Sequence, residues 1–216
     1  PFLFEDMENA VKRIQKAGKN KEKIIIYGDY DVDGISGVAY LVIMLRRLGL
    51  NVDYYIPNRV HKGTGINKHV LAFLKKWDAK LFITVDTSIN NLEEMMLLKD
   101  RGIDIIITDH HRKTGISENE EKNLGVLTIN PKSSKNYPNK FLSGSGVAFK
   151  LADAVYEAYG ANKKILYDYL DIIMIGTVAD VVPMTDENRF IIKKGLNNLK
   201  KTKIKGLKYI INYLKI

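Results

Sequence analysis

Three groups of acidic and histidine side chains each follow a short apolar segment. The first group places three carboxylates at alternate positions within residues 29–33. Like charges this close raise one another's pKa unless a cation lies among them. Carboxylates with an imidazole, in a chain that has no cysteine, suit Mn²⁺ or Mg²⁺ better than a structural zinc site. The members of the three groups are Asp29, Asp31 and Asp33, then Asp86, and then Asp109, His110 and His111.

The apolar segments have the pattern of buried strands that alternate with helices. Short connections and nearly all-apolar strands are typical of a parallel sheet covered on both faces. Ligands bind beyond the carboxyl ends of such strands, so the three groups are expected to converge there. We predict an α/β fold with a mostly parallel sheet flanked by helices on both faces. The expected strands are 24–28, 52–56, 80–86, 103–108 and 126–129, and the expected helices begin near Met7 or span 35–48, 67–76 and 92–101.

From about Gly144 the pattern becomes helical, and these helices are expected to pack on the sheet. We predict one domain over 1–216, with a sheet core at 1–143 and a helical part at 144–216. Small residues at 143–146 precede a helix, where backbone amides can bind an anion, although glycine is common at helix starts. Asp180 follows a helix and is a further candidate ligand. The expected helices are 146–159, 163–176, 187–199 and 206–214, and 112–125 is expected to be an irregular loop.

The composition is that of a soluble globular protein, with 45% apolar and 27% charged residues. No apolar run approaches the roughly 18 residues of a membrane span, and the absence of cysteine fits a cytoplasmic setting. The net charge of +9 has two interpretations, a lysine-rich background or a polyanionic partner. Because the chain begins at Pro1, we expect it to be a piece of a longer protein.

Each of these acidic residues also has a purely structural interpretation. A single aspartate at a strand end is more often a helix N-cap than a metal ligand. Recurrence at successive strand ends favours the metal interpretation instead. Asp86, on a central strand, is the natural bridge between two ions roughly 3.5–4 Å apart, an arrangement used for phosphoester cleavage.

Five motifs in order resemble those of the DHH phosphoesterase superfamily. The RecJ-like single-strand-specific exonucleases are the most similar branch, and the similarity covers almost the whole chain. The motifs lie at residues 27–34, 84–86, 108–111, 143–150 and 176–184.

The resemblance implies a hydrolase with two Mn²⁺ ions, with Mg²⁺ as an alternative. Asp31 and Asp86 would bind one ion, and Asp29 would assist it. The other ion would be bound by Asp33, Asp86, His110 and Asp180. Asp109 would orient its neighbours, and the expected substrate-phosphate contacts are His111, Ser145, Gly146, Arg189 and Arg59.

The chain departs from the family pattern in three respects. Tyr27 stands where many relatives have His, so the first ion is expected to bind more weakly. Thr87 and Ser88 replace the usual Asn or Cys followed by Gly. No segment resembles the glycine-rich DHHA1-type domain of the family.

The resemblance implies a 5′-to-3′ exonuclease that acts on single-stranded DNA, in DNA repair and recombination. Two alternatives remain open. One is a phosphodiesterase for short oligonucleotides or cyclic dinucleotides, and the other is a non-catalytic scaffold like the replication factor Cdc45. The metal ligands survive in this chain, which favours the enzymes over the scaffold.

Overall fold

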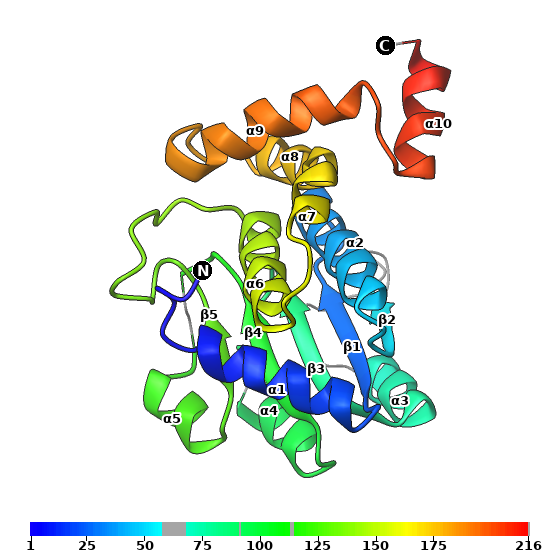
Figure 1. Ribbon diagram of the computed structural model, residues 1–216. Coiled ribbons are helices and arrows are strands. Elements are labelled where there is room, and N and C mark those ends of the chain that lie inside the picture. Colours follow the sequence, from blue (N-terminus) through cyan, green and yellow to red (C-terminus); the bar gives the residue numbers. More distant parts are fainter. Residues whose placement is uncertain (58–67, 91, 113–114, 216) are drawn as a thin grey trace.

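The protein, seen here as a computed structural model, is built on a five-stranded parallel sheet (Figure 1). The structure describes residues 1–57, 68–90, 92–112 and 115–215. The strand order is β2-β1-β3-β4-β5, so the chain first extends the sheet on one side of β1 and then on the other. This confirms the predicted fold class. The strands are β1 (Lys23–Gly28), β2 (Val52–Tyr55), β3 (Ala79–Val85), β4 (Asp104–Thr108) and β5 (Leu127–Ile129).

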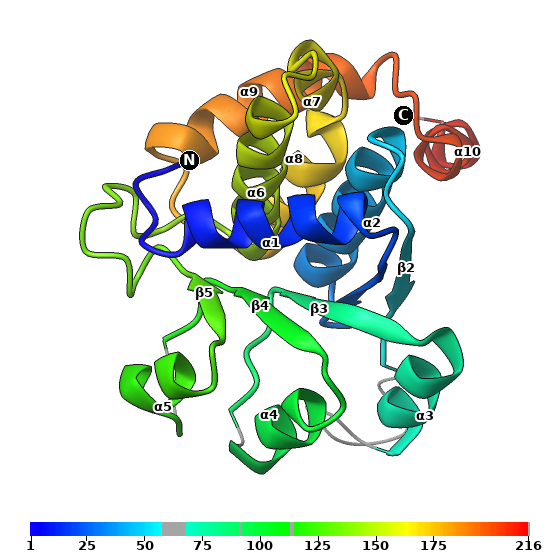
Figure 2. The same cartoon turned by 60° about the horizontal axis from the view of Figure 1, so that its bottom comes forward.

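Helices cover both faces of the sheet, as Figure 2 shows. Side chains alternate along each strand: Ile24 and Ile26 of β1 belong to one apolar core, and Ile25 and Tyr27 belong to the other. The first core lies under α1 (Met7–Lys19), α2 (Val32–Arg47) and α6 (Gly144–Ala158), and the second lies over α3 (Lys68–Trp77) and α4 (Leu92–Lys99).

The remaining helices continue the layer that contains α2 and α6. They are α7 (Lys164–Asp168), α8 (Leu170–Ala179), α9 (Asp186–Leu199) and α10 (Lys205–Leu214). Helix α8 packs against α2 and α6, and α9 packs against α8. This packing brings the end of α8 towards the carboxyl end of the sheet. Among the helices that the structure describes, none combines the length and the apolar character that a membrane crossing requires.

Three local predictions were wrong. The predicted loop at 112–125 contains α5 (Glu118–Asn123), whose N-terminus is fixed by a capping box between Ser117 and Glu120. The predicted helix 163–176 is divided at Tyr169, which leaves helical geometry with φ −111° and ψ 18°. Helix α2 begins at Val32 instead of residue 35, because Asp31 caps it.

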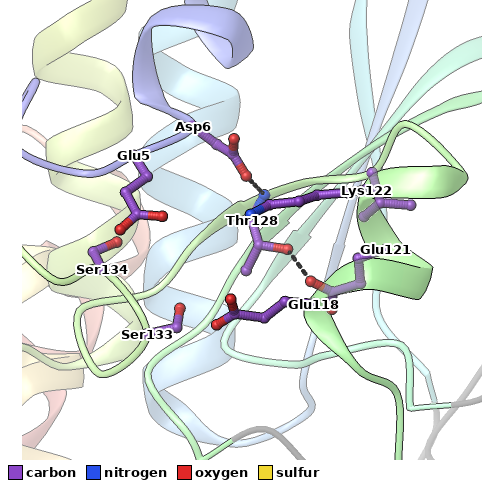
Figure 3. Close-up of a pocket in the computed structure, with 9 residues that line it drawn as sticks. Glu5, Asp6, Glu118, Glu121, Lys122, Thr128, Ser133 and Ser134 are labelled. Atoms are coloured by element: carbon purple, nitrogen blue, oxygen red, sulfur yellow. Dashed lines mark hydrogen bonds between the residues drawn. The ribbon is translucent and has the colours of Figure 1, made fainter.

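The edge strand β5 is covered by contacts from two other segments (Figure 3). The Thr128 backbone N–H donates to Asp6 Oδ2 at 2.8 Å, and the Thr128 hydroxyl donates to Glu121 Oε2 at 2.9 Å. These bonds satisfy an outward-facing donor of the strand that would otherwise be open to another chain. Three of the residues that line the hollow in Figure 3, Asp6, Glu121 and Thr128, are therefore engaged in structural hydrogen bonds.

Arg13 joins α1 to the amino-terminal end of the sheet. Its guanidinium donates to Asp104 Oδ2 at 2.6 Å and to the Lys80 carbonyl at 3.0 Å, and it pairs with Glu22 Oε2 at 2.7 Å. The Arg13 side chain is only 12% exposed. Burial favours the neutral forms of Glu22 and Asp104. Contacts from Asn20 and Arg13 to Glu22, and from Lys99 and Arg13 to Asp104, nevertheless hold the pKa of both carboxyls below their usual values.

We expect Arg13→Met to lower the free energy of unfolding by about 1–3 kcal/mol at pH 7, because it removes the buried guanidinium from two carboxylates and leaves them only Asn20 and Lys99 as hydrogen-bond partners among the described residues. A carboxyl with a depressed folded pKa contributes stability above its unfolded pKa and loses it as pH falls through its folded value. The difference between the two proteins should therefore shrink below about pH 4. Urea unfolding at several pH values measures it.

Lys12→Met is the matched control, because Lys12 pairs with Glu8 on the exposed face of the same helix. An exposed pair of this kind contributes at most about 0.5 kcal/mol. Equal losses in the two variants would contradict a special role for Arg13.

Candidate metal centre

The predicted ligands follow strand ends that lie in one row. Gly28 pairs with Val85, Val85 with Thr108, and Thr108 with Ile129. The next residue of each strand continues the row: Asp86 N–H donates to the Thr108 carbonyl at 2.9 Å, and Asp109 N–H donates to the Ile129 carbonyl at 3.2 Å. The register of the sheet therefore places the acidic motifs side by side.

Asp33 lies in the first turn of α2 and is 1% exposed. Its carboxylate accepts from the backbone amides of Gly144, at 2.7 Å, and Ser145, at 3.1 Å. These amides begin α6, where the helix dipole also favours a negative charge. Asp33 is thus held by a helix that begins 111 residues later in the chain.

Asp86 directly follows β3, lies in the left-handed region with φ +58°, and is 1% exposed. This conformation turns the chain sharply out of the strand at the floor of the site. Burial, together with the nearby carboxylates of Asp33 and Asp31, raises the pKa of Asp86 to about 10. Without a cation, the site therefore favours a neutral Asp86.

Three buried ligand atoms in this site have no hydrogen-bond partner among the described residues: Asp86 Oδ1, His110 Nε2 and Asp180 Oδ2. His110 Nε2 lies 3.2 Å from Asp86 Oδ1 and 3.5 Å from Asp180 Oδ2. Burial lowers the pKa of His110 and raises the pKa of Asp180, because both side chains are removed from water. Buried polar atoms without partners are rare, and oxygen and imidazole atoms of this kind could together serve as ligands of a divalent cation.

Within the part of the chain that the structure describes, two groups of side chains have ligand atoms close enough to hold one ion. The atoms of each group lie within 4.8 Å of one another. One group contains Asp33, His110 and Asp180, and the other contains Asp86, His110 and His111. The set expected from the resemblance, Asp33, Asp86, His110 and Asp180, contains the first group and also Asp86. The expected pair of Asp31 and Asp86 shares only Asp86 with the second group.

Asp109 binds its own motif. Its Oδ1 accepts from the backbone N–H of His110 at 2.8 Å and of His111 at 3.2 Å, and it lies 2.8 Å from His111 Nδ1. Ser88 Oγ donates to Asp109 Oδ2 at 2.5 Å. Burial would raise the pKa of Asp109, but the bonds from His111 and Ser88 hold it below its usual value. The bond to Asp109 raises the pKa of His111 to about 9.

Asp31 and Asp29 lie at the more open side of the site. Asp31 is the N-cap of α2, and its Oδ1 accepts from the Gly34 N–H at 2.9 Å. It therefore has the capping role that a single aspartate often has, and its second carboxylate oxygen is not used by the cap. Asp29 accepts from the Tyr30 N–H at 2.6 Å. Partial burial raises the pKa of Asp29, and the charge of Asp31 adds to this.

The backbone amides of Ser145 and Gly146, which were predicted to bind a substrate phosphate, donate to other residues of the chain. Ser145 N–H donates to Asp33, and Gly146 N–H donates to Ser143 Oγ at 3.1 Å. The anion that the first of these amides binds is therefore a carboxylate of the chain. Arg189 is exposed in the first turn of α9, and Arg59 lies outside the described residues.

Tyr27, which stands where many relatives have His, is a core residue. It is 4% exposed and its ring packs against those of Tyr55 and Phe82, 6.2 and 5.4 Å away between centroids.

The chain matches the model of the DHH family, N-terminal domain, over residues 23–177. This region contains every candidate ligand described above except Asp180. The chain belongs to the DHH family.

The similarity of the chain to individual proteins supports this assignment. The chain is 40% identical over 211 residues to the single-stranded-DNA-specific exonuclease RecJ of Bacillus subtilis, covering 98% of this chain and 26% of that protein. A crystal structure of exonuclease RecJ bound to manganese matches 97% of this chain and 52% of its own, with a TM-score of 0.85 and 31% identity. RecJ of Thermus thermophilus in complex with Mn²⁺ matches 97% of this chain and 29% of its own, with a TM-score of 0.82 and 30% identity. The chain thus spans about a quarter of the length of its Bacillus relative.

Two glycines within the motifs at 143–150 and 176–184, neither of them predicted as a site residue, make room for carboxylates of this site. A Cβ on Gly144 would lie 2.3 Å from Asp86 Oδ1, and a Cβ on Gly176 would lie 2.6 Å from Asp33 Oδ1. Helices α6 and α8 therefore approach the carboxylates as closely as their backbones allow. The unpartnered buried atoms, the oxygen-rich ligands and this close backbone fit a divalent metal ion.

We expect Gly144→Ala to weaken Mn²⁺ binding at least about tenfold, because the added methyl group and the buried Asp86 carboxylate cannot occupy the same space. Isothermal titration calorimetry on the metal-free protein measures this, with circular dichroism to confirm folding. Gly206→Ala is the matched control, since a Cβ there meets nothing within 4 Å. Unchanged Mn²⁺ affinity in Gly144→Ala would contradict the assignment of Asp86 as a ligand.

Proposed function

We propose that this chain carries the active site of a metal-dependent phosphodiester hydrolase that shortens single-stranded DNA from its 5′ end. The observation that supports it most strongly is the convergence of Asp86 Oδ1, His110 Nε2 and Asp180 Oδ2, which are buried and unpartnered among the described residues at the carboxyl end of the sheet. The relatives named single-stranded-DNA-specific exonuclease RecJ support the choice of substrate.

The proposed ligands divide between two Mn²⁺ ions, with Mg²⁺ as the alternative. Bound divalent ions lower the pKa of a coordinated water and stabilise charge on the attacked phosphate. Asp86, on the central strand, is the proposed bridge. Asp33, His110 and Asp180 are proposed for one ion, and Asp31, assisted by Asp29, for the other.

His111 is the proposed contact to the scissile phosphate. Its side chain is 57% exposed, unlike that of His110 at 7%, so it is open to a ligand. Nδ1 is bound to Asp109, which leaves Nε2 for the substrate. The bond to Asp109 raises the pKa of His111 to about 9 in the metal-free protein, and a protonated ring would suit a phosphate oxygen and the protonation of a leaving group.

The distribution of charge supports a polyanionic substrate. Residues 188–216 contain nine Lys or Arg and no Asp or Glu, so the formal charge of this segment is as large as the net charge of the whole chain, +9. The described lysines of α9 and α10 are exposed. A basic segment joined to a metal centre attracts a phosphate backbone through counterion release.

The test is Mn²⁺-dependent release of mononucleotides from a 5′-phosphorylated single strand, with a linear dinucleotide in parallel. We expect shortening of the long strand from its 5′ end. His110→Ala should lower kcat/KM at least about a hundredfold without unfolding the chain, because its Nε2 has no hydrogen-bond partner among the described residues. Cleavage of the dinucleotide alone would replace the proposal with a small-substrate phosphodiesterase, and failure to bind Mn²⁺ would favour a scaffold.

Asp33→Ala is a less clean variant for this test. Because Asp33 accepts from Gly144 and Ser145, its removal leaves two buried amides at the start of α6 without an acceptor. A loss of about 1–3 kcal/mol of stability is expected in addition to any loss of activity. His110→Ala therefore separates metal binding from folding better than Asp33→Ala.

A further inference from the structure

We propose that Ser88 is a positioning residue that fixes the His111 imidazole through Asp109. The inference rests on the proposed function of His111 as the phosphate contact. It concerns a dipeptide, Thr87–Ser88, at which this chain departs from the usual family pattern.

The contacts form a short chain from the loop after β3 to the open side of the site. Ser88 Oγ donates to Asp109 Oδ2 at 2.5 Å, and Asp109 Oδ1 lies 2.8 Å from His111 Nδ1. Asp109 is 1% exposed, so the carboxylate that accepts both bonds is buried. Hydrogen bonds to a buried carboxylate are charge-assisted and are stronger than those between neutral groups.

The backbone explains why Ser88 can reach Asp109. Asp86 adopts φ +58° and turns the chain out of β3, while its N–H remains bound to the Thr108 carbonyl. The residues after Asp86 are thus held beside the residues after Thr108. The neighbouring Thr87 hydroxyl is directed elsewhere and lies 3.5 Å from the Ser88 carbonyl.

The two oxygens of Asp109 have different partners. Oδ1 accepts from the backbone N–H groups of residues 110 and 111 and contacts His111 Nδ1, and Oδ2 accepts from the Ser88 hydroxyl. The Ser88 bond stops the carboxylate from rotating about its bond to Cβ. Because Oδ1 stays in place, the His111 ring stays in one orientation and presents Nε2 outward.

Removal of the hydroxyl should therefore affect His111 more than the fold. In Ser88→Ala, the Nδ1–H proton of His111 should lose its protection from solvent exchange, and its downfield proton resonance should broaden or vanish. In the same variant, kcat should fall about five- to fiftyfold, with little change in KM for the single strand. Ser88→Thr retains the hydroxyl and should restore both properties.

The nuclear magnetic resonance measurement is made on the metal-free chain, so it does not depend on the proposed activity. His111→Asn assigns the resonance, and Thr87→Ala is the matched control that should leave it unchanged. A Ser88→Ala protein that keeps the resonance and kcat of the unmodified chain would overturn the proposal. Equal loss in Thr87→Ala and Ser88→Ala would also overturn it, because it would indicate a general effect of the loop.

Discussion

The hydrogen bonds between Asp33 and the first amides of α6 are the interaction on which the site depends. They join the motif that follows β1 to a helix from the second half of the chain, and both partners are buried. The same helix start carries Gly144, whose lack of a side chain lets Asp86 occupy its position. The contact between Asp33 and the start of α6 thus fixes the helical layer against the carboxyl end of the sheet, and with it the positions of the Asp33 and Asp86 carboxylates.

This arrangement concentrates like charge in a buried place, which is costly without compensation. The raised pKa of Asp86 and of Asp180 shows that the protein by itself does not fully compensate it. Amide donors stabilise Asp33, and hydroxyl and imidazole donors stabilise Asp109. Asp86 and Asp180 each keep a buried oxygen that has no hydrogen-bond partner among the described residues.

Asp109 and Asp33 illustrate two uses of an acidic residue in one site. Asp109 accepts hydrogen bonds from its own motif and from Ser88, so it holds His110 and His111 in position. Asp33 binds the helix start and also belongs to a group with His110 and Asp180. The difference follows from which donors surround each carboxylate and not from its position after a strand.

The sequence by itself determined the strands, their parallel arrangement and the convergence of Asp86, Asp109 and His110 at one edge. These features follow from local apolar patterns, because the carboxyl ends of parallel strands must meet. A local signal also existed for α5, since Ser117 and Glu120 have the spacing of a capping box.

Only the tertiary structure decided which donors bind which carboxylate. That Ser145 binds Asp33 instead of a substrate phosphate, and that Ser88 reaches Asp109, depends on contacts between segments distant in the chain. Such contacts arise from the packing of α6 on α2 and from the left-handed turn at Asp86. Neither leaves a periodic pattern in the sequence, because each depends on the geometry of two elements at once.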